Sequence, residues 1–156
     1  MRRCLRSAAF AVCAVLSGCG GGGSAPRPAE AAPPPAELVD GDLRIRASAV
    51  PSMQLPESVA REYGIQRGEH RVLLLVALRR DTNGDEATLP GSVQAQATDL
   101  QGRTQPIALR EVRTGELVDH VGIVEVSPPE TLRFEIRAIP AGESPRSLQF
   151  VREFYP

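Results

Sequence analysis

The sequence predicts an all-β protein, an immunoglobulin-like antiparallel β-sandwich of about seven strands with one short connecting helix. In most segments after residue 38, apolar and polar residues alternate, as expected of strands with one face in a core and the other in water. Turn-forming residues separate these segments at short intervals. Only one segment has the features of a helix, which excludes an all-α or alternating α/β class.

The strands are predicted from their apolar periodicity. In the first, residues 43–49, Leu43, Ile45 and two alanines alternate with two arginines and a serine. Residues 72–78 form an uninterrupted apolar run, which is typical of a central strand covered on both faces. A turn is predicted at residues 99–102, and it leads into a strand that carries Ile107 and Leu109. The remaining predicted strands are residues 93–97, 117–126, 131–139 and 148–154.

The helix is predicted over residues 56–63 and serves as a connector. Pro56 suits the first helical turn, Glu57 suits the positive end of the helix dipole, and Gly64 is a favourable residue just after the end. The antibody hallmark of a cysteine pair packed on a tryptophan is absent, so the immunoglobulin likeness is one of architecture.

The acidic segment 81–86 is predicted to be a hairpin turn. Its alternating oxygen-bearing side chains suggest a calcium loop, but Glu86 stands where that loop needs glycine and Ser92 where it needs glutamate. Asn83 and Gly84 both tolerate positive φ and lie between two strand patterns, which favours a tight turn.

Residues 1–18 have the pattern of a secretory signal peptide. Three arginines precede an apolar run over residues 8–16, and small residues follow it. A membrane-spanning helix needs about 20 apolar residues, more than this run supplies. Arg2 and Arg3 suggest twin-arginine export, but Arg6 stands where that signal needs a hydrophobic residue, so general secretion is predicted.

The end of this segment, Leu16-Ser17-Gly18-Cys19, resembles the lipobox of bacterial lipoproteins. The resemblance implies that the Cys19 thiol receives a diacylglycerol and that cleavage occurs just before it. The alternative is ordinary signal cleavage nearby, with Cys19 left as a free thiol. Gly20 rather than aspartate follows the cysteine, which by the sorting rule of such lipoproteins implies the outer membrane, with the domain facing the periplasm.

Residues 19–37 are predicted to be a disordered tether, and residues 38–156 the sandwich domain. Gly, Pro and Ala make up 14 of the 19 tether residues, so this segment has too few large apolar side chains to form a core. All three cysteines precede the domain. The domain therefore has no disulfide, no cysteine-based zinc site and no cysteine nucleophile.

Three segments carry a resemblance to a known family. They are VAREYGI at residues 59–65, ETLRFEIRAIP at residues 130–140 and FVREFY at residues 150–155. Together they resemble domain-of-unknown-function family 4426, found in exported proteins of proteobacteria, over nearly all of residues 38–156. The resemblance implies no activity and no catalytic residue. Relatives often carry His-Tyr-Asn in the first strand, where this chain has Arg46, Ala47 and Ser48, and many lack a lipobox.

Catalytic and metal sites depend on two histidines, His70 and His120. Asp119 and His120 with a serine could form a hydrolytic triad, but the nucleophile-elbow motif is missing. His120 shares a predicted strand face with Gly122 and two valines, which favours a packed histidine, and His70 is predicted to lie in a solvated loop. The histidines also lack the spacings of common metal motifs, so no catalytic residue, metal ligand or cofactor is assigned.

The charge balance argues against nucleic-acid binding. Without the three arginines of the signal, the net charge is −4, whereas nucleic-acid binders have basic surfaces. Most aromatic residues alternate like core residues, which argues against a base- or sugar-stacking surface. The sequence thus predicts a membrane-anchored lipoprotein whose periplasmic domain binds or scaffolds an envelope protein through an edge strand or loop face. The alternative is an enzyme or metal-handling accessory that uses His70 and His120.

Overall fold

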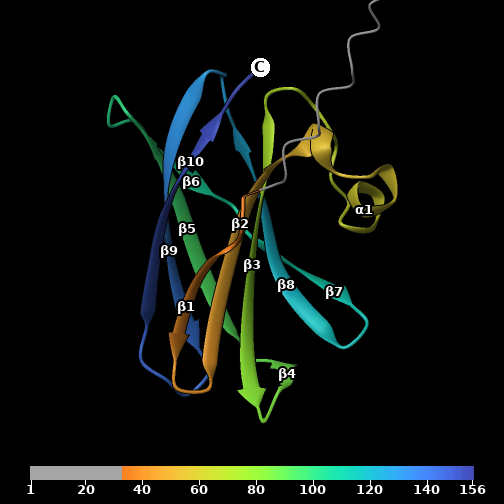
Figure 1. The fold of residues 1–156 in the computed structure, drawn as a ribbon, viewed down its shortest axis with the longest axis vertical. Coiled ribbons are helices and arrows are strands. Elements are labelled where there is room, and N and C mark those ends of the chain that lie inside the picture. The colour runs from red at the N-terminus through yellow and green to blue at the C-terminus, as the bar shows by residue number, and fades with distance from the viewer. Residues whose placement is uncertain (1–32) are drawn as a thin grey trace, which may run out of the picture. The chain divides into compact units, whose positions relative to one another are not determined.

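The computed structural model describes residues 33–156, which form an antiparallel β-sandwich with one short α-helix (Figure 1). The predicted fold class is confirmed. The elements are β1 (Ala36–Asp40), β2 (Leu43–Pro51), η1 (Ser52–Gln54), α1 (Glu57–Glu62), β3 (Arg71–Thr82), β4 (Asp85–Thr88), β5 (Gly91–Asp99), β6 (Thr104–Ile107), β7 (Arg110–Thr114), β8 (Leu117–Glu125), β9 (Glu130–Pro140) and β10 (Arg146–Phe154). Among the described residues, no helix is long and apolar enough to cross a membrane.

Two sheets enclose the core. One has the order β1-β2-β3-β8-β7, with β4 paired to the end of β3, and the other has the order β10-β9-β5-β6. Each neighbouring pair is antiparallel. The chain crosses between the sheets from β4 to β5, from β6 to β7 and from β8 to β9, so residues distant in sequence pack against one another.

Inward-facing residues of both sheets form the main core. Alternating members of β2, β3 and β9, including Ile45, Leu74 and Ile136, are at most 2% exposed. Phe134 is fully buried and stacks on Phe150, with ring centroids 4.9 Å apart and planes 10° from parallel. The sequence periodicity therefore identified the buried faces of β2 and β9 correctly, and β3 is largely buried on both faces, as its uninterrupted apolar run predicted.

The turns follow the predicted chemistry. Asn83 and Gly84 adopt φ of 59° and 91° and form the two-residue connection between β3 and β4. Asp81 accepts a 2.8 Å hydrogen bond from the Gly84 N–H through its carboxylate, and that bond and Arg44 lower the pKa of Asp81. The segment is a hairpin and not a calcium loop.

A second, smaller apolar cluster attaches the helix to the outer face of the larger sheet. Leu55, Tyr63 and Ile65 pack against buried residues of β3, β7 and β8, among them Leu73 and Val121. The Arg110 guanidinium also donates a hydrogen bond to the Tyr63 carbonyl. The helix begins at Glu57 and ends at Glu62, one residue inside each predicted limit, and it connects β2 to β3 as expected.

Three observed strands were not predicted: β1, β4 and β7. Strand β1 begins at Ala36, so the ordered domain starts two residues before the expected boundary at residue 38. The three strands have mostly exposed side chains, and each pairs with a neighbour along its length. Their structure depends on pairing with a neighbouring strand and not on burial of an apolar face, which explains the weak periodicity.

Two contacts connect the edge strands β1 and β10, which belong to different sheets. The Arg146 guanidinium donates a 2.7 Å hydrogen bond to the Asp40 carboxylate. The Arg152 guanidinium donates a 2.6 Å hydrogen bond to the carbonyl of Pro34, just before β1. One side of the sandwich is therefore closed by side chains, while the β6–β7 connection closes the other.

Candidate binding face

The outward face of the β10-β9-β5-β6 sheet carries rows of polar side chains. In the strand register, Gln94 lies opposite Arg137, which lies opposite Ser147. The adjacent row contains Gln96, Glu135 and Gln149. Alternation places these six side chains on one face because the residues between them point into the core. We call these six residues the polar face.

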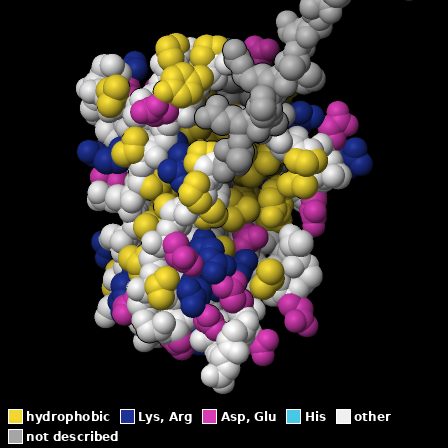
Figure 2. All heavy atoms as spheres, viewed as in Figure 1, with side chains coloured by type: hydrophobic (Ala, Val, Ile, Leu, Met, Phe, Trp, Pro, Cys, Tyr) yellow, Lys and Arg dark blue, Asp and Glu magenta, His cyan; other side chains and the backbone are white. Residues whose placement is uncertain are grey.

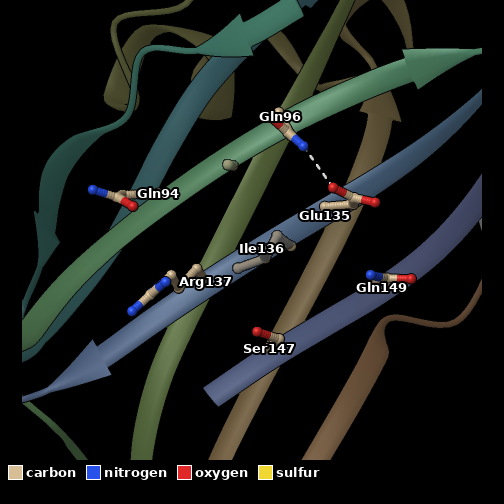
Figure 3. A pocket seen from close by; sticks show the side chains of 8 residues that line it. Gln94, Gln96, Glu135, Ile136, Arg137, Ser147 and Gln149 are labelled. Atoms are coloured by element: carbon tan, nitrogen blue, oxygen red, sulfur yellow. Dashed lines mark hydrogen bonds between the residues drawn. The ribbon is translucent and has the colours of Figure 1, made fainter. Parts of the chain in front are cut away.

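The polar face is hollowed where the two rows meet. The hollow has a volume of about 280 Å³ and is open to solvent, with backbone atoms near Ala95 and Ile136 at its floor (Figure 3). Gln96 donates a 2.5 Å hydrogen bond to the Glu135 carboxylate across the strands. Figure 3 shows the side chains from β5, β9 and β10 around this open surface.

Most of the hydrogen-bonding capacity of this face is unused within the domain. The side chains of Gln94, Arg137, Ser147 and Gln149 make no hydrogen bond or ion pair with another described residue. The guanidinium of Arg137, the two glutamine amides and the Ser147 hydroxyl together provide both hydrogen-bond donors and acceptors. Such a set suits a ligand with a carboxylate and backbone-like amide groups, while the absence of an aromatic residue argues against sugar stacking.

Sequence reasoning did not single out the polar face. Alternation identified these residues only as solvent-facing members of their strands: Gln94, Gln96, Glu135 and Arg137. The pairing of β5 with β9, and of β9 with β10, brings these residues together. A run of amide side chains on a predicted strand face was the one local signal that could have indicated this site.

The two histidines lie far apart. Val126 donates a 2.9 Å backbone hydrogen bond to the His70 carbonyl, and Val126 is six residues beyond His120 along the chain. At about 3.3 Å per strand residue, roughly 20 Å separates the two positions. His70 is exposed and His120 is buried, as the sequence predicted.

His120 packs on the inner side of the larger sheet. Its Nε2 atom lies 3.8 Å from a carboxylate oxygen of Glu111 on β7, and its buried Nδ1 atom has no hydrogen-bond partner among the described residues. No group of three or more histidine, cysteine or acidic side chains in residues 33–156 could hold a metal ion. The alternative site of His70 and His120 is therefore not assembled in this part of the chain.

An ion pair that the sequence did not predict lies on the outer face of the larger sheet. Arg79 and Asp119 have side chains only 6% and 11% exposed, and the Arg79 guanidinium donates to the Asp119 carboxylate and to the Val118 carbonyl. Burial, followed by the negative charge of Asp119, raises the pKa of the nearby Tyr63 hydroxyl. The pair is surrounded by protein, so it contributes to packing under the helix and is not an open site.

We expect Asp119→Ala to lower the free energy of unfolding by about 3–5 kcal/mol, because it leaves the Arg79 charge buried without its partner. Equilibrium urea denaturation measures the effect. The matched control is Asp42→Ala, which removes an exposed partner of Arg80 and should change stability by about 1 kcal/mol or less. Equal losses in the two variants would contradict a special role for the buried pair.

The predicted lipobox, Leu16, Ser17, Gly18 and Cys19, lies outside the described residues, as do the signal peptide at residues 1–18 and most of the tether at residues 19–37. The structure adds only the point at which the chain enters the domain. Residues 33–35 precede β1 and lead into the edge of the larger sheet.

The comparisons with known proteins agree with the sandwich. A family model described as "Domain of unknown function (DUF4426)" matches residues 38–156. A solved structure of a DUF4426 family protein from Pseudomonas aeruginosa is similar, with 24% identity, a TM-score of 0.66, and coverage of 78% of this chain and 95% of that one. No curated protein matches the chain.

Two solved structures of FetP from uropathogenic Escherichia coli strain F11 are also similar. One is a copper-bound variant with a TM-score of 0.54, covering 78% of this chain and 96% of FetP. The other is FetP as isolated, with a TM-score of 0.55 and coverage of 78% and 95%. Identity is 10% in both comparisons, so this likeness concerns the fold alone.

Proposed function

This chain belongs to the DUF4426 family, and from that premise we propose that it is a lipid-anchored binding module of the bacterial envelope. The anchor is the diacylglycerol on Cys19, the tether joins the domain to this anchor in the outer membrane, and the polar face binds an extended segment of an envelope protein. The family description assigns no activity, so the proposal depends on this chain's own residues.

One observation carries the binding role: four polar side chains around the 280 Å³ hollow have no partner among the described residues. An extended peptide has backbone N–H and C=O groups that Gln94, Gln149 and Ser147 can pair with. Arg137 is the only cation lining the hollow, and its planar fork suits a carboxylate of the partner. The predicted recognition through an edge strand or loop is replaced in this proposal by recognition through a sheet face.

The metal-handling alternative receives less support. The copper in the FetP variant belongs to that protein, whose identity to this chain is 10%. In the described residues of this chain His70 lies just before β3 and His120 lies within β8, well apart from each other, and no metal-ligating cluster is present. We therefore favour the binding role.

The binding role is tested by site-specific crosslinking in cells. A photoreactive amino acid replacing Gln149 should give a discrete crosslinked partner, and Arg137→Ala should weaken that crosslink. Loss of a hydrogen bond to a charged group removes about 1.5–3 kcal/mol, so we expect roughly tenfold or greater loss of affinity for the isolated partner.

The matched control is Arg113→Ala, which removes an exposed arginine from β7 in the other sheet. This variant should retain the crosslink. Crosslinking that is insensitive to Arg137, or equally sensitive to Arg113, would refute recognition by the polar face.

A further inference from the structure

Exposed apolar side chains lie together at one end of the sandwich. Leu100, Pro129 and Tyr155 are exposed and line one hollow of about 140 Å³, together with the buried Phe154 and the polar side chains of Gln101, Glu130, Thr131 and Glu153. We call the three exposed apolar residues the apolar tip. Leu100 and Tyr155 are 77% and 71% exposed, more than any other large hydrophobic residue described. Figure 2 shows hydrophobic side chains at the end of the molecule where Figure 1 places the C-terminus.

Leu100 has no packing role in the domain. It lies in the turn between β5 and β6, where the Gly102 N–H donates a 3.1 Å hydrogen bond to the Asp99 carbonyl. A polar residue would serve this turn equally well, because the backbone and the Asp99 side chain hold its shape. A large aliphatic side chain at such a position exposes apolar surface to water without a compensating contact.

The chain enters the domain at this same end. The carbonyl of Pro34 accepts a hydrogen bond from Arg152, two residues before Phe154. Cys19 precedes Pro34 by 15 residues. A lipid on Cys19 would therefore be joined to the domain at the end that carries the apolar tip, and not at the opposite end of the strands.

We propose that the apolar tip is a membrane-contact surface that rests on the bilayer holding the lipid of Cys19. Leucine and tyrosine suit the interface because the first buries an aliphatic chain and the second places a ring at headgroup depth. Arg103 stands at the same turn, where its Nε donates to the Asp99 carboxylate, and its side chain is 78% exposed. Its other guanidinium N–H groups can donate to a lipid phosphate. The inference rests on the proposed anchor, which supplies the high local concentration that makes so small an apolar surface effective.

Contact through the apolar tip orients the domain. The strands run from this end to the opposite one, where the turns at Gly84 and Gly115 lie. Nine strand residues span about 30 Å, so those turns would stand well away from the lipid. The polar face, along the middle of its sheet, would remain accessible to a partner from the side.

The test measures how deeply two positions of the domain lie in the bilayer of vesicles that contain no other protein. The lipidated chain carries an azide amino acid at position 101 or 116, coupled to a fluorophore, and is reconstituted with phosphatidylethanolamine, phosphatidylglycerol and a nitroxide-labelled lipid. We expect stronger quenching at position 101 than at position 116. Leu100→Asn should reduce the quenching at 101 to the level at 116. The control Leu117→Asn, which removes an exposed leucine at the opposite end, should leave it unchanged.

Equal quenching at 101 and 116, or no effect of Leu100→Asn, would overturn membrane contact. Burial of position 101 in native membranes but not in vesicles would also overturn it and would identify a protein contact instead. Failure of the anchor is recognised separately, since the protein would then not float with vesicles. In that case a maleimide lipid coupled to Cys19 supplies the attachment, and the same comparison decides the role of the apolar tip.

Discussion

We expect a Cys19→Ser variant to incorporate no fatty-acid label and to accumulate as uncleaved precursor. The proposed modification requires a thiol, because a serine hydroxyl is a much weaker nucleophile at neutral pH. Each buried methylene of an acyl chain contributes about 0.8 kcal/mol to membrane binding, and two or three chains give stable attachment. We therefore expect the Cys19→Ser protein to lose the fatty-acid label completely and not in part.

The chain supplies two matched controls, Cys4→Ser and Cys13→Ser, which change cysteines within the predicted signal. Both variants should retain label and cleavage. Metabolic labelling with a fatty acid, followed by membrane flotation, measures the outcome. Label on the Cys19→Ser protein would refute the lipobox, and cleaved but unlabelled wild-type protein would support ordinary signal cleavage.

The second large effect is expected from Phe134→Ala, which should lower the free energy of unfolding by about 3–5 kcal/mol. Phe134 is fully buried, stacks on Phe150 and meets the Phe154 ring edge-on at 6.4 Å between centroids. Truncation removes its buried area, leaves a cavity and breaks both ring contacts. Because a domain of this size has a net stability of about 5–15 kcal/mol, a large share would be lost.

Urea denaturation followed by circular dichroism measures this change. Phe134→Leu retains most of the apolar volume and should be less destabilised. Tyr155→Ala removes an aromatic residue that is 71% exposed and should change stability by about 0.5 kcal/mol or less. A Phe134→Ala midpoint equal to that of Tyr155→Ala would contradict the assigned position of Phe134 at the centre of the core.

The sequence predicted the fold well where one strand face is buried. Alternation around Ile45 and Phe134, and the positive-φ turn at Asn83, are local signals, and the structure confirms them. Strand β4 escaped prediction because its residues are mostly exposed and its structure comes from pairing with β3. Arg79 ended the expected apolar run, yet β3 continues to Thr82 because residues 79–82 pair with β4, and the buried Arg79 guanidinium is paired with Asp119, which is distant in sequence.

The candidate site was less accessible to sequence reasoning. The polar face takes Gln94 from β5, Arg137 from β9 and Ser147 from β10, and only the strand register places them in one row. Each residue alone is an ordinary solvent-facing side chain.

The attachment of the chain through β1 has a mechanical consequence. β1 is a five-residue edge strand, paired only with β2, and its side chains are mainly exposed. Under tension from the proposed anchor, β1 is the first element to bear load and can peel away while the β2-β3-β8 pairing stays intact. Its release would lengthen the tether by about 17 Å at 3.3 Å per residue. The domain could then move farther from its anchor without unfolding of its core.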